Sequence, residues 1–82
     1  MKADRSATPK TLQQAHDFLM RTMPRRHEPP QVWLEFRRNA AKIYFEIAEI
    51  DRFHHHEALY WANWEEAKAA ECAALIAEAD RR

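Results

Sequence analysis

The longest stretch of helical periodicity in this chain is residues 31–51, QVWLEFRRNAAKIYFEIAEID. Its apolar side chains recur every three or four residues, the spacing that places them on one face of an α-helix. They are Val32, Phe36, Ala40, Ile43, Ile47 and Ile50. Trp33 and Tyr44 widen this stripe on one side, and Leu34 and Phe45 lie on another flank. A helix that is apolar around so much of its circumference is covered on two sides, so we expect two neighbours for it.

A shorter helix is predicted before this stretch. Thr11 and Gln14 form a capping-box pattern, and a proline follows Met23, so we expect a helix over residues 11–23. Residues 24–30 contain three prolines and are expected to form a stiff connector. The apolar face of the first helix comprises Leu12, Ala15, His16, Leu19, Met20 and Met23.

A third helix is predicted over residues 54–80, where helical spacing returns. No glycine or proline marks its start, but residues 52–56 interrupt the apolar stripe. We therefore favour a turn at residues 51–54 and an antiparallel hairpin of residues 31–51 and 54–80. The alternative is one helix over residues 31–80, about 75 Å long. Such a helix would bury its apolar stripe only by dimerising.

The composition predicts an all-α protein, because alanine supplies fifteen residues and glycine none. The absence of glycine excludes Walker loops, dinucleotide-binding glycine turns and nucleophile elbows. We expect a disordered leader over residues 1–10 and a single helical domain over residues 11–82. The core of so small a domain is marginal. With the broad apolar surface of residues 31–51, this predicts a homodimer or a protein partner that supplies a helix.

The net charge is zero, because thirteen Lys and Arg residues balance thirteen Asp and Glu residues. A neutral chain lacks the positive field typical of proteins that bind nucleic acid, so this partner is disfavoured. The charge is uneven: residues 1–31 carry six bases and three acids, and residues 53–82 carry three bases and six acids. Cys72 stands alone, can form no internal disulfide and is expected to be buried. No apolar run suits a signal peptide or a membrane span, so we expect a cytoplasmic location.

Residues 50–62, IDRFHHHEALYWA, resemble a signature shared by a group of small uncharacterised actinobacterial proteins. That signature has aspartate, arginine and glycine, then three histidines, then Glu-Ala-Leu-Tyr-Trp-Ala, and the similarity extends over about residues 11–70. Phe53 stands where the family has a glycine, which would suit a helix end followed by a turn. The resemblance implies no established activity and no mechanism.

His54, His55 and His56 form an internal run between Asp51 and Glu57. Asp51 and His54, like His54 and Glu57, have the spacing that lets two side chains on a helix bind one metal ion. Asp51, His54, His55 and Glu57 would hold zinc or another divalent transition metal. The interpretation that we favour is that these histidines end a helix in solvent and that the protein needs no cofactor. Adjacent histidines that gain charge repel one another, which predicts a loss of stability between about pH 7 and 5.5.

Five aromatic residues are candidate contacts for a protein partner. They are Trp33, Phe36, Tyr60, Trp61 and Trp64. Tryptophan and tyrosine are enriched at the energetic centres of interfaces, and they fill helix packing equally well. Both interpretations stay open, with Trp64 expected to be more exposed than Trp61.

One carboxylate is predicted to be buried. The apolar face of residues 54–80 comprises Leu59, Ala62, Glu66, Ala69, Ala73, Ile76 and Ala79. A buried carboxylate needs a partner, and His16, Arg37 or Lys42 could supply one to Glu66. No nucleophile or phosphate-binding element accompanies such a pair, so we predict no catalytic residue and no enzyme.

The sequence therefore favours a small, non-catalytic protein-interaction module that forms a homodimer. The first alternative is a metal-binding or pH-responsive helical module that uses the histidines at positions 54–56. The second is a companion of a transcription regulator, in which the basic residues 21–27 contact an acidic surface or phosphates.

Overall fold

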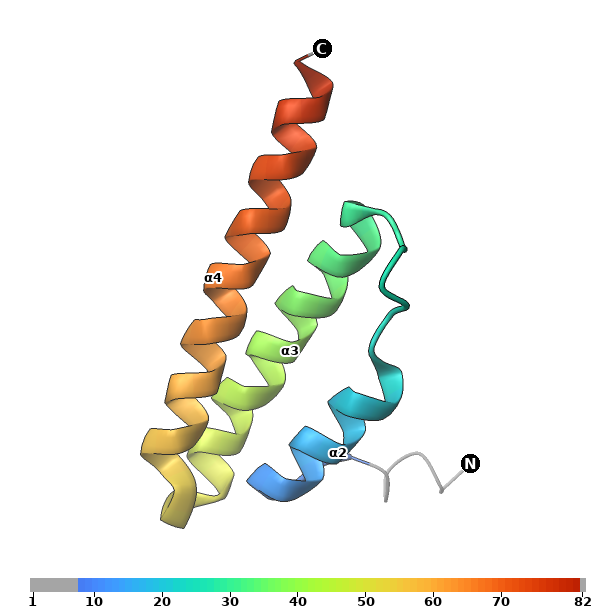
Figure 1. Ribbon diagram of the computed structural model, residues 1–82. Helices are drawn as coiled ribbons and strands as arrows, with labels where there is room; N and C mark the ends of the chain where they lie inside the picture. Colours follow the sequence, from blue (N-terminus) through green and yellow to red (C-terminus); the bar gives the residue numbers. More distant parts are fainter. Residues whose placement is uncertain (1–7, 82) are drawn as a thin grey trace.

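The computed structural model describes residues 8–81, which form three α-helices and one short 3-10 helix (Figure 1). The elements are α2 (Leu12–Thr22), α3 (Pro30–Ile50), η1 (Arg52–His54) and α4 (His55–Asp80). No strand occurs within residues 8–81, so the predicted all-α class is confirmed. The leader expected over residues 1–10 lies mainly outside the described residues.

α2 starts where the capping box predicts. Thr11 Oγ1 accepts a hydrogen bond from the backbone N–H of Gln14 at 3.1 Å, and Gln14 Oε1 accepts one from the backbone N–H of Lys10 at 2.9 Å. The helix ends at Thr22, because Met23 adopts the extended backbone that a residue before proline prefers. It is one residue shorter at each end than the predicted range.

α3 starts at consecutive prolines, with Pro30 in the first turn, where the missing N–H leaves no hydrogen bond unmade. It ends at Ile50. The N–H of Asp51 still donates to the Ile47 carbonyl at 2.7 Å, and the N–H of His54 donates to the Asp51 carbonyl at 2.9 Å. The predicted turn at residues 51–54 is therefore present, and the alternative of one continuous helix over residues 31–80 is wrong.

α3 is the central helix. α4 runs back along it from the turn, and α2 lies beside the C-terminal half of α3 (Figure 1). The core holds alanines from all three helices, so the backbones approach closely. Its fully buried large side chain is Ile47, and its members are Leu12, Ala15, Leu19, Ala40, Tyr44, Ile47, Ala48, Ala58 and Ala62.

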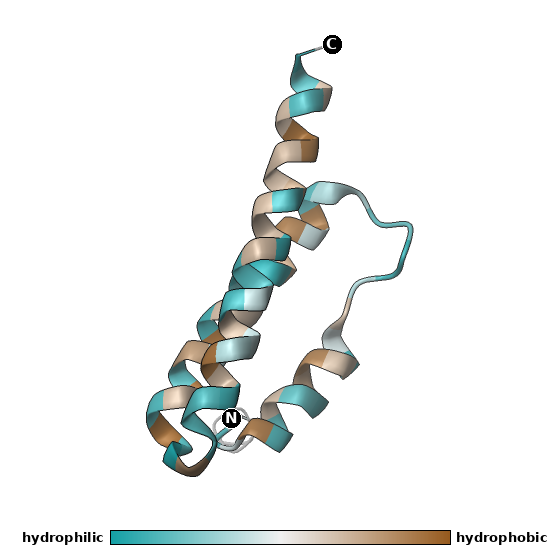
Figure 2. Cartoon of the chain, turned by 60° about the vertical axis from the view of Figure 1, so that its left-hand side comes forward, coloured by the Kyte–Doolittle hydropathy of each residue, from teal (hydrophilic) through white to brown (hydrophobic). Residues whose placement is uncertain are grey.

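The last turns of α4 project beyond the start of α3 (Figure 1). Figure 2 shows that apolar residues continue into this projecting part, where Leu75 is 60% exposed. Cys72 is half-buried, so the prediction that it is buried is wrong. None of the described helices is long and apolar enough to cross a membrane.

The buried carboxylate belongs to Glu65, and the prediction of Glu66 is wrong. Glu65 is 5% exposed and shares the buried face of α4 with Ala58, Ala62 and Ala69, whereas Glu66 is exposed. The predicted apolar face was rotated by about one residue, because α4 is apolar on several sides and its sequence does not fix which side meets α3. The partner of Glu65 is one of the predicted candidates, Arg37.

Candidate interaction face

Four of the five candidate aromatic residues gather on one side of the molecule. The rings of Trp61 and Trp64 on α4 are 5.7 Å apart, and those of Trp33 and Phe36 on α3 are 5.8 Å apart. Arg37 joins the two pairs, because its guanidinium carbon lies 5.0 Å from the Trp33 ring centre and 5.2 Å from that of Trp64. We call these four aromatic residues and Arg37 the aromatic face.

Arg37 is held at the aromatic face by a partly buried ion pair. Its Nη1 donates to Glu65 Oε1 at 3.0 Å, and the two side chains are 18% and 7% exposed. Burial raises the pKa of the Glu65 carboxyl, and the bond and charge of Arg37 oppose that rise. Arg37 therefore favours the charged form of Glu65 and lies against the rings of both Trp33 and Trp64.

One end of the aromatic face is closed by a contact between α2 and α4. His16 Nδ1 and the Tyr44 hydroxyl form a hydrogen bond of 2.7 Å, and the His16 ring lies 5.5 Å from the Trp61 ring in an edge arrangement. Burial, followed by the charge of Glu65, raises the pKa of Tyr44 to about 12. Tyr44 therefore stays a neutral phenol that links all three helices. His16 was one predicted partner of the Glu66 carboxylate, but its hydrogen bond is to the Tyr44 hydroxyl.

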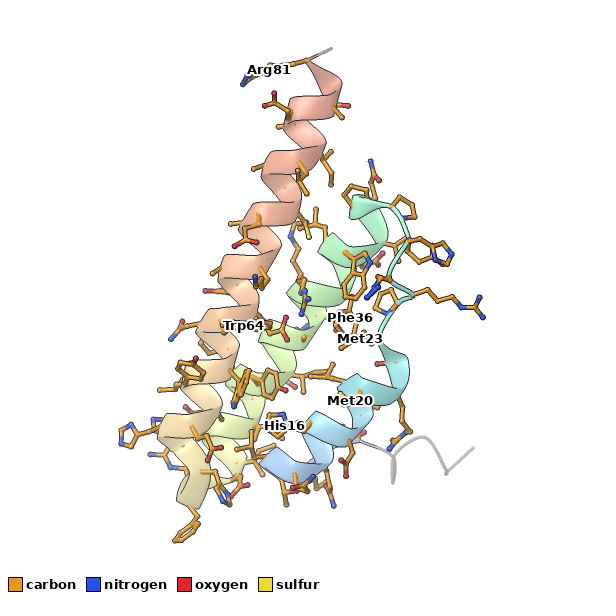
Figure 3. All side chains as sticks on the ribbon, viewed as in Figure 1. His16, Met20, Met23, Phe36, Trp64 and Arg81 are labelled. Carbon is orange, nitrogen blue, oxygen red and sulfur yellow. The ribbon has the colours of Figure 1, made fainter. Side chains whose placement is uncertain are left out.

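The other end of the aromatic face is open and continues onto α2 through two methionines. Met20 follows His16 by four residues, so the two lie on the same side of α2, and Met23 follows the last residue of the helix. Met20 is 70% exposed and Met23 is 45% exposed. Figure 3 shows both in the region between α2 and α3, with Phe36 beside Met23 and Trp64 toward α4. Methionine is flexible and polarisable, which suits contacts with varied surfaces.

Tyr60 lies outside this grouping. Its ring touches Trp61 at an edge, 5.3 Å between centres, but the residue is 60% exposed on the outer side of α4. Trp61 and Trp64 are both half-buried, and the greater exposure expected of Trp64 stays a prediction. Met20 and Met23 were not predicted as contact residues for a partner. Their spacing placed them on the apolar face of the first helix, and no neighbouring residue in the sequence indicates that this end of the aromatic face stays uncovered.

The connector after α2 is tied to the aromatic face. The indole N–H of Trp33 donates to the Arg25 carbonyl at 3.2 Å. The basic side chains of this segment are exposed, and they are Arg25, Arg26 and His27; Arg21, in the last turn of α2, is exposed as well. Trp33 therefore fixes the path of the connector while its basic residues point into solvent.

Asp51 joins the turn to the start of α2. Its Oδ2 accepts hydrogen bonds from the backbone N–H of Leu12 and from His54 Nδ1, each at 2.9 Å. The bond from Leu12 is the largest cause that lowers the pKa of the Asp51 carboxyl, and the bond and charge of His54 add to it. Asp51 is therefore an anionic acceptor that fastens two elements far apart in the sequence.

The remaining residues of the predicted metal site are not brought together. His55 Nδ1 donates to the Ala48 carbonyl at 2.8 Å, whereas Glu57 is exposed. Within residues 8–81, no three His, Cys, Asp or Glu side chains are grouped so that they could hold a metal ion. The structure thus pairs Asp51 with His54 and leaves the other two candidate ligands apart.

No family model matches the chain, and neither the curated proteins nor the solved structures include a significant match. The resemblance of residues 50–62 to an actinobacterial family therefore stays a prediction.

Proposed function

We propose that this protein is a small, non-catalytic protein-interaction module of the cytoplasm, which works as a homodimer and binds a further protein partner through the aromatic face and its two methionines. One observation carries the proposal. Met20 and Met23 extend a strip of half-buried aromatic rings on α3 and α4, and no described segment covers this open end. Aromatic and methionine side chains around a buried arginine are the composition that binding hot spots favour.

The polar groups beside the aromatic face support an architectural role. Tyr44 is bonded to His16, and Glu65 is bonded to Arg37. No buried side-chain nitrogen or oxygen among the described residues lacks a hydrogen-bond partner. Polar side chains whose hydrogen bonds are already made within the protein hold the neighbouring aromatic rings in position.

Affinity capture with matched variants tests the proposed face. Met20→Glu places a charge on the face at a position so exposed that the fold should tolerate it. Phe53→Glu is the control, because Phe53 is 91% exposed at the turn, away from the aromatic face. We expect the wild type and the Phe53 variant to capture the same protein in similar amounts. The Met20 variant should capture at least about tenfold less of it. Identical capture by all three proteins would contradict the proposal.

A second candidate function, a pH-responsive or metal-binding module at the turn, is favoured by the Asp51–His54 contact. A zinc titration by calorimetry at about pH 7.5, with metal-stripped protein that carries no tag, tests its metal-binding form. Micromolar binding that His54→Gln abolishes would support it. A titration without heat, or with the same heat in the variant, would count against it.

A further inference from the structure

The exposed side of α3 turned away from the aromatic face carries charges in an ordered sequence. Along the chain the charged residues are Glu35, Arg38, Lys42, Glu46 and Glu49, and Arg52 follows at the start of η1, where it also lies 3.4 Å from Glu49 of the same chain. All are exposed. Their spacing of three or four residues keeps the five on α3 on one side of the helix. We call these six residues the charged stripe.

The charged stripe is complementary to an inverted copy of itself. When one copy is laid antiparallel to another about a point close to Tyr44, charges that face one another to within one residue have opposite signs. Glu35 faces Arg52 and Arg38 faces Glu49 about a point between Ile43 and Tyr44, and Lys42 lies within one residue of the position that faces Glu46. A parallel pairing in register would instead set each charge against the same charge. The pattern therefore favours a contact with two-fold symmetry, in which each pair occurs twice.

A groove lies beside the charged stripe, between α3 and α4. It has a volume of about 700 Å³. Its apolar lining is made of one aromatic ring and small side chains, namely Phe45, Ala41, Ala69, Ala70 and Ala73. Arg38, Lys42, Glu46 and Glu49 of the stripe also line it, together with Glu66 of α4. The surface thus has the composition of a protein interface, with an apolar centre inside a charged rim.

Phe45 occupies the position where a two-fold contact would be most apolar. It is half-buried and lies within two residues of the inversion point of the stripe. In an antiparallel pair of α3 helices, residues at this point meet their counterparts in the other copy. The alanines of α4 are small enough to let a second helix approach closely.

We infer that a second copy of this chain binds here, with the two α3 helices antiparallel and the two Phe45 rings at the centre of the contact. Opposite charges at both ends of each helix set the register. This inference rests on the homodimer in the proposed function, but it does not depend on the aromatic face, which stays free on each copy.

Charge reversal with full-length protein, followed by sedimentation equilibrium, tests the inference. Arg38→Glu with Lys42→Glu sets acids against Glu46 and Glu49 of the second copy, and Glu46→Lys with Glu49→Lys sets bases against Arg38 and Lys42. We expect each double variant to dimerise at least about tenfold more weakly than the wild type. Mixing the two double variants restores opposite charges in every pair and should restore the dimer.

Two controls keep this test sharp. Lys10→Glu with Arg21→Glu changes the net charge by the same amount on exposed residues outside the contact, and its dimer should match the wild type. The chain that carries all four reversals keeps the wild-type net charge and should dimerise again. This variant keeps the test decisive if one of the double variants does not fold. A monomeric wild type, double variants that dimerise as well as the wild type, or a mixture that stays monomeric would each overturn the inference.

The same measurements separate this inference from the aromatic face. Met20→Glu should leave the dimer intact while it abolishes capture of the partner. If the wild type is monomeric but Met20→Glu still abolishes capture of the partner, the dimer is overturned and the proposal for the aromatic face is retained.

Discussion

The carboxylate of Asp51 accepts a hydrogen bond of 2.9 Å from the backbone N–H of Leu12, although 39 residues separate the two. Leu12 opens α2, and its N–H is one of the donors that a helix start leaves without an intrahelical partner. Thr11 satisfies the donor on Gln14, so the threonine and the aspartate share the capping of one helix. This contact orients α2 against α3, and it therefore positions Met20 and Met23 beside the aromatic face.

Replacing Asp51 should loosen α2. Asp51→Ala removes the acceptor of both Leu12 and His54, and we expect the melting temperature to fall by on the order of 5 °C. Asp51→Asn keeps an oxygen acceptor without the charge. Its melting temperature should lie between those of the wild type and Asp51→Ala. Thermal unfolding followed by circular dichroism measures this. A variant as stable as the wild type would show that the contact does not hold α2.

The same carboxylate gives the protein an acid-sensitive contribution to stability. The pKa of Asp51 is lowered in the folded protein, so the unfolded state binds its proton at higher pH than the folded state does. The stabilisation is therefore complete above the ordinary aspartate pKa of about 4, and it is lost as the pH falls through the lower folded value. The difference in melting temperature between the wild type and Asp51→Asn should shrink as the pH falls below about 4. A difference that grows below pH 4 would contradict this.

The Arg37–Glu65 ion pair should contribute less to the free energy of unfolding than is lost when only one of the two partners is removed. Arg37→Leu leaves a buried carboxylate without its partner and should destabilise the fold by about 2–3 kcal/mol. Adding Glu65→Leu to that variant should recover much of the loss, because the unpaired charge is gone. Urea unfolding of both single variants and the double variant completes the cycle. Additive losses would mean that the two residues act independently.

This pair also gives the Arg37 variant a pH dependence of known sign. Burial raises the pKa of Glu65, and Arg37 opposes that rise, so the folded state of Arg37→Leu should bind the Glu65 proton more tightly than the unfolded state does. Stability then falls as the pH rises through the range in which the unfolded carboxyl ionises. The variant should be closest to the wild type near pH 4, and a deficit that stays the same between pH 4 and 7 would argue against this account.

Tyr44 should set the alkaline limit of the fold. Its pKa is raised to about 12, so the neutral phenol stabilises the folded state fully below the ordinary tyrosine pKa of about 10. That contribution is lost as the pH rises toward the folded value. Tyr44→Phe removes it, so the stability of the variant should depend less on pH between 10 and 12. Urea midpoints of the two proteins across this range measure the effect, and parallel curves would contradict it.

The sequence predicted the features that depend on neighbours along the chain. Thr11, Gln14 and the prolines mark the ends of helices through local backbone chemistry, so these boundaries agree with the structure to about one residue. The buried position on α4 was wrong by one residue, because the rotation of a helix is decided by what packs against it. Only the position of Arg37 shows that Glu65, and not Glu66, has a partner.

The contacts that join distant elements could not be predicted in this way. Asp51 was assigned to a metal site from its spacing to His54, but its partner at Leu12 depends on where α2 folds back. Met20 and Met23 had the periodicity of core residues, and their exposure arises because the aromatic face stays open at that end. Such relationships depend on the angles between helices, which helical spacing does not encode.

Site-specific photo-crosslinking asks directly whether another protein lies on the aromatic face in the cell. A photoreactive amino acid would replace Met20 in one variant, Met23 in a second and Phe53, as the exposed control, in a third. The account predicts one discrete adduct at positions 20 and 23 and none at position 53. Irradiation that gives no adduct at either methionine, or the same adducts at all three positions, would contradict the claim that this face binds a partner.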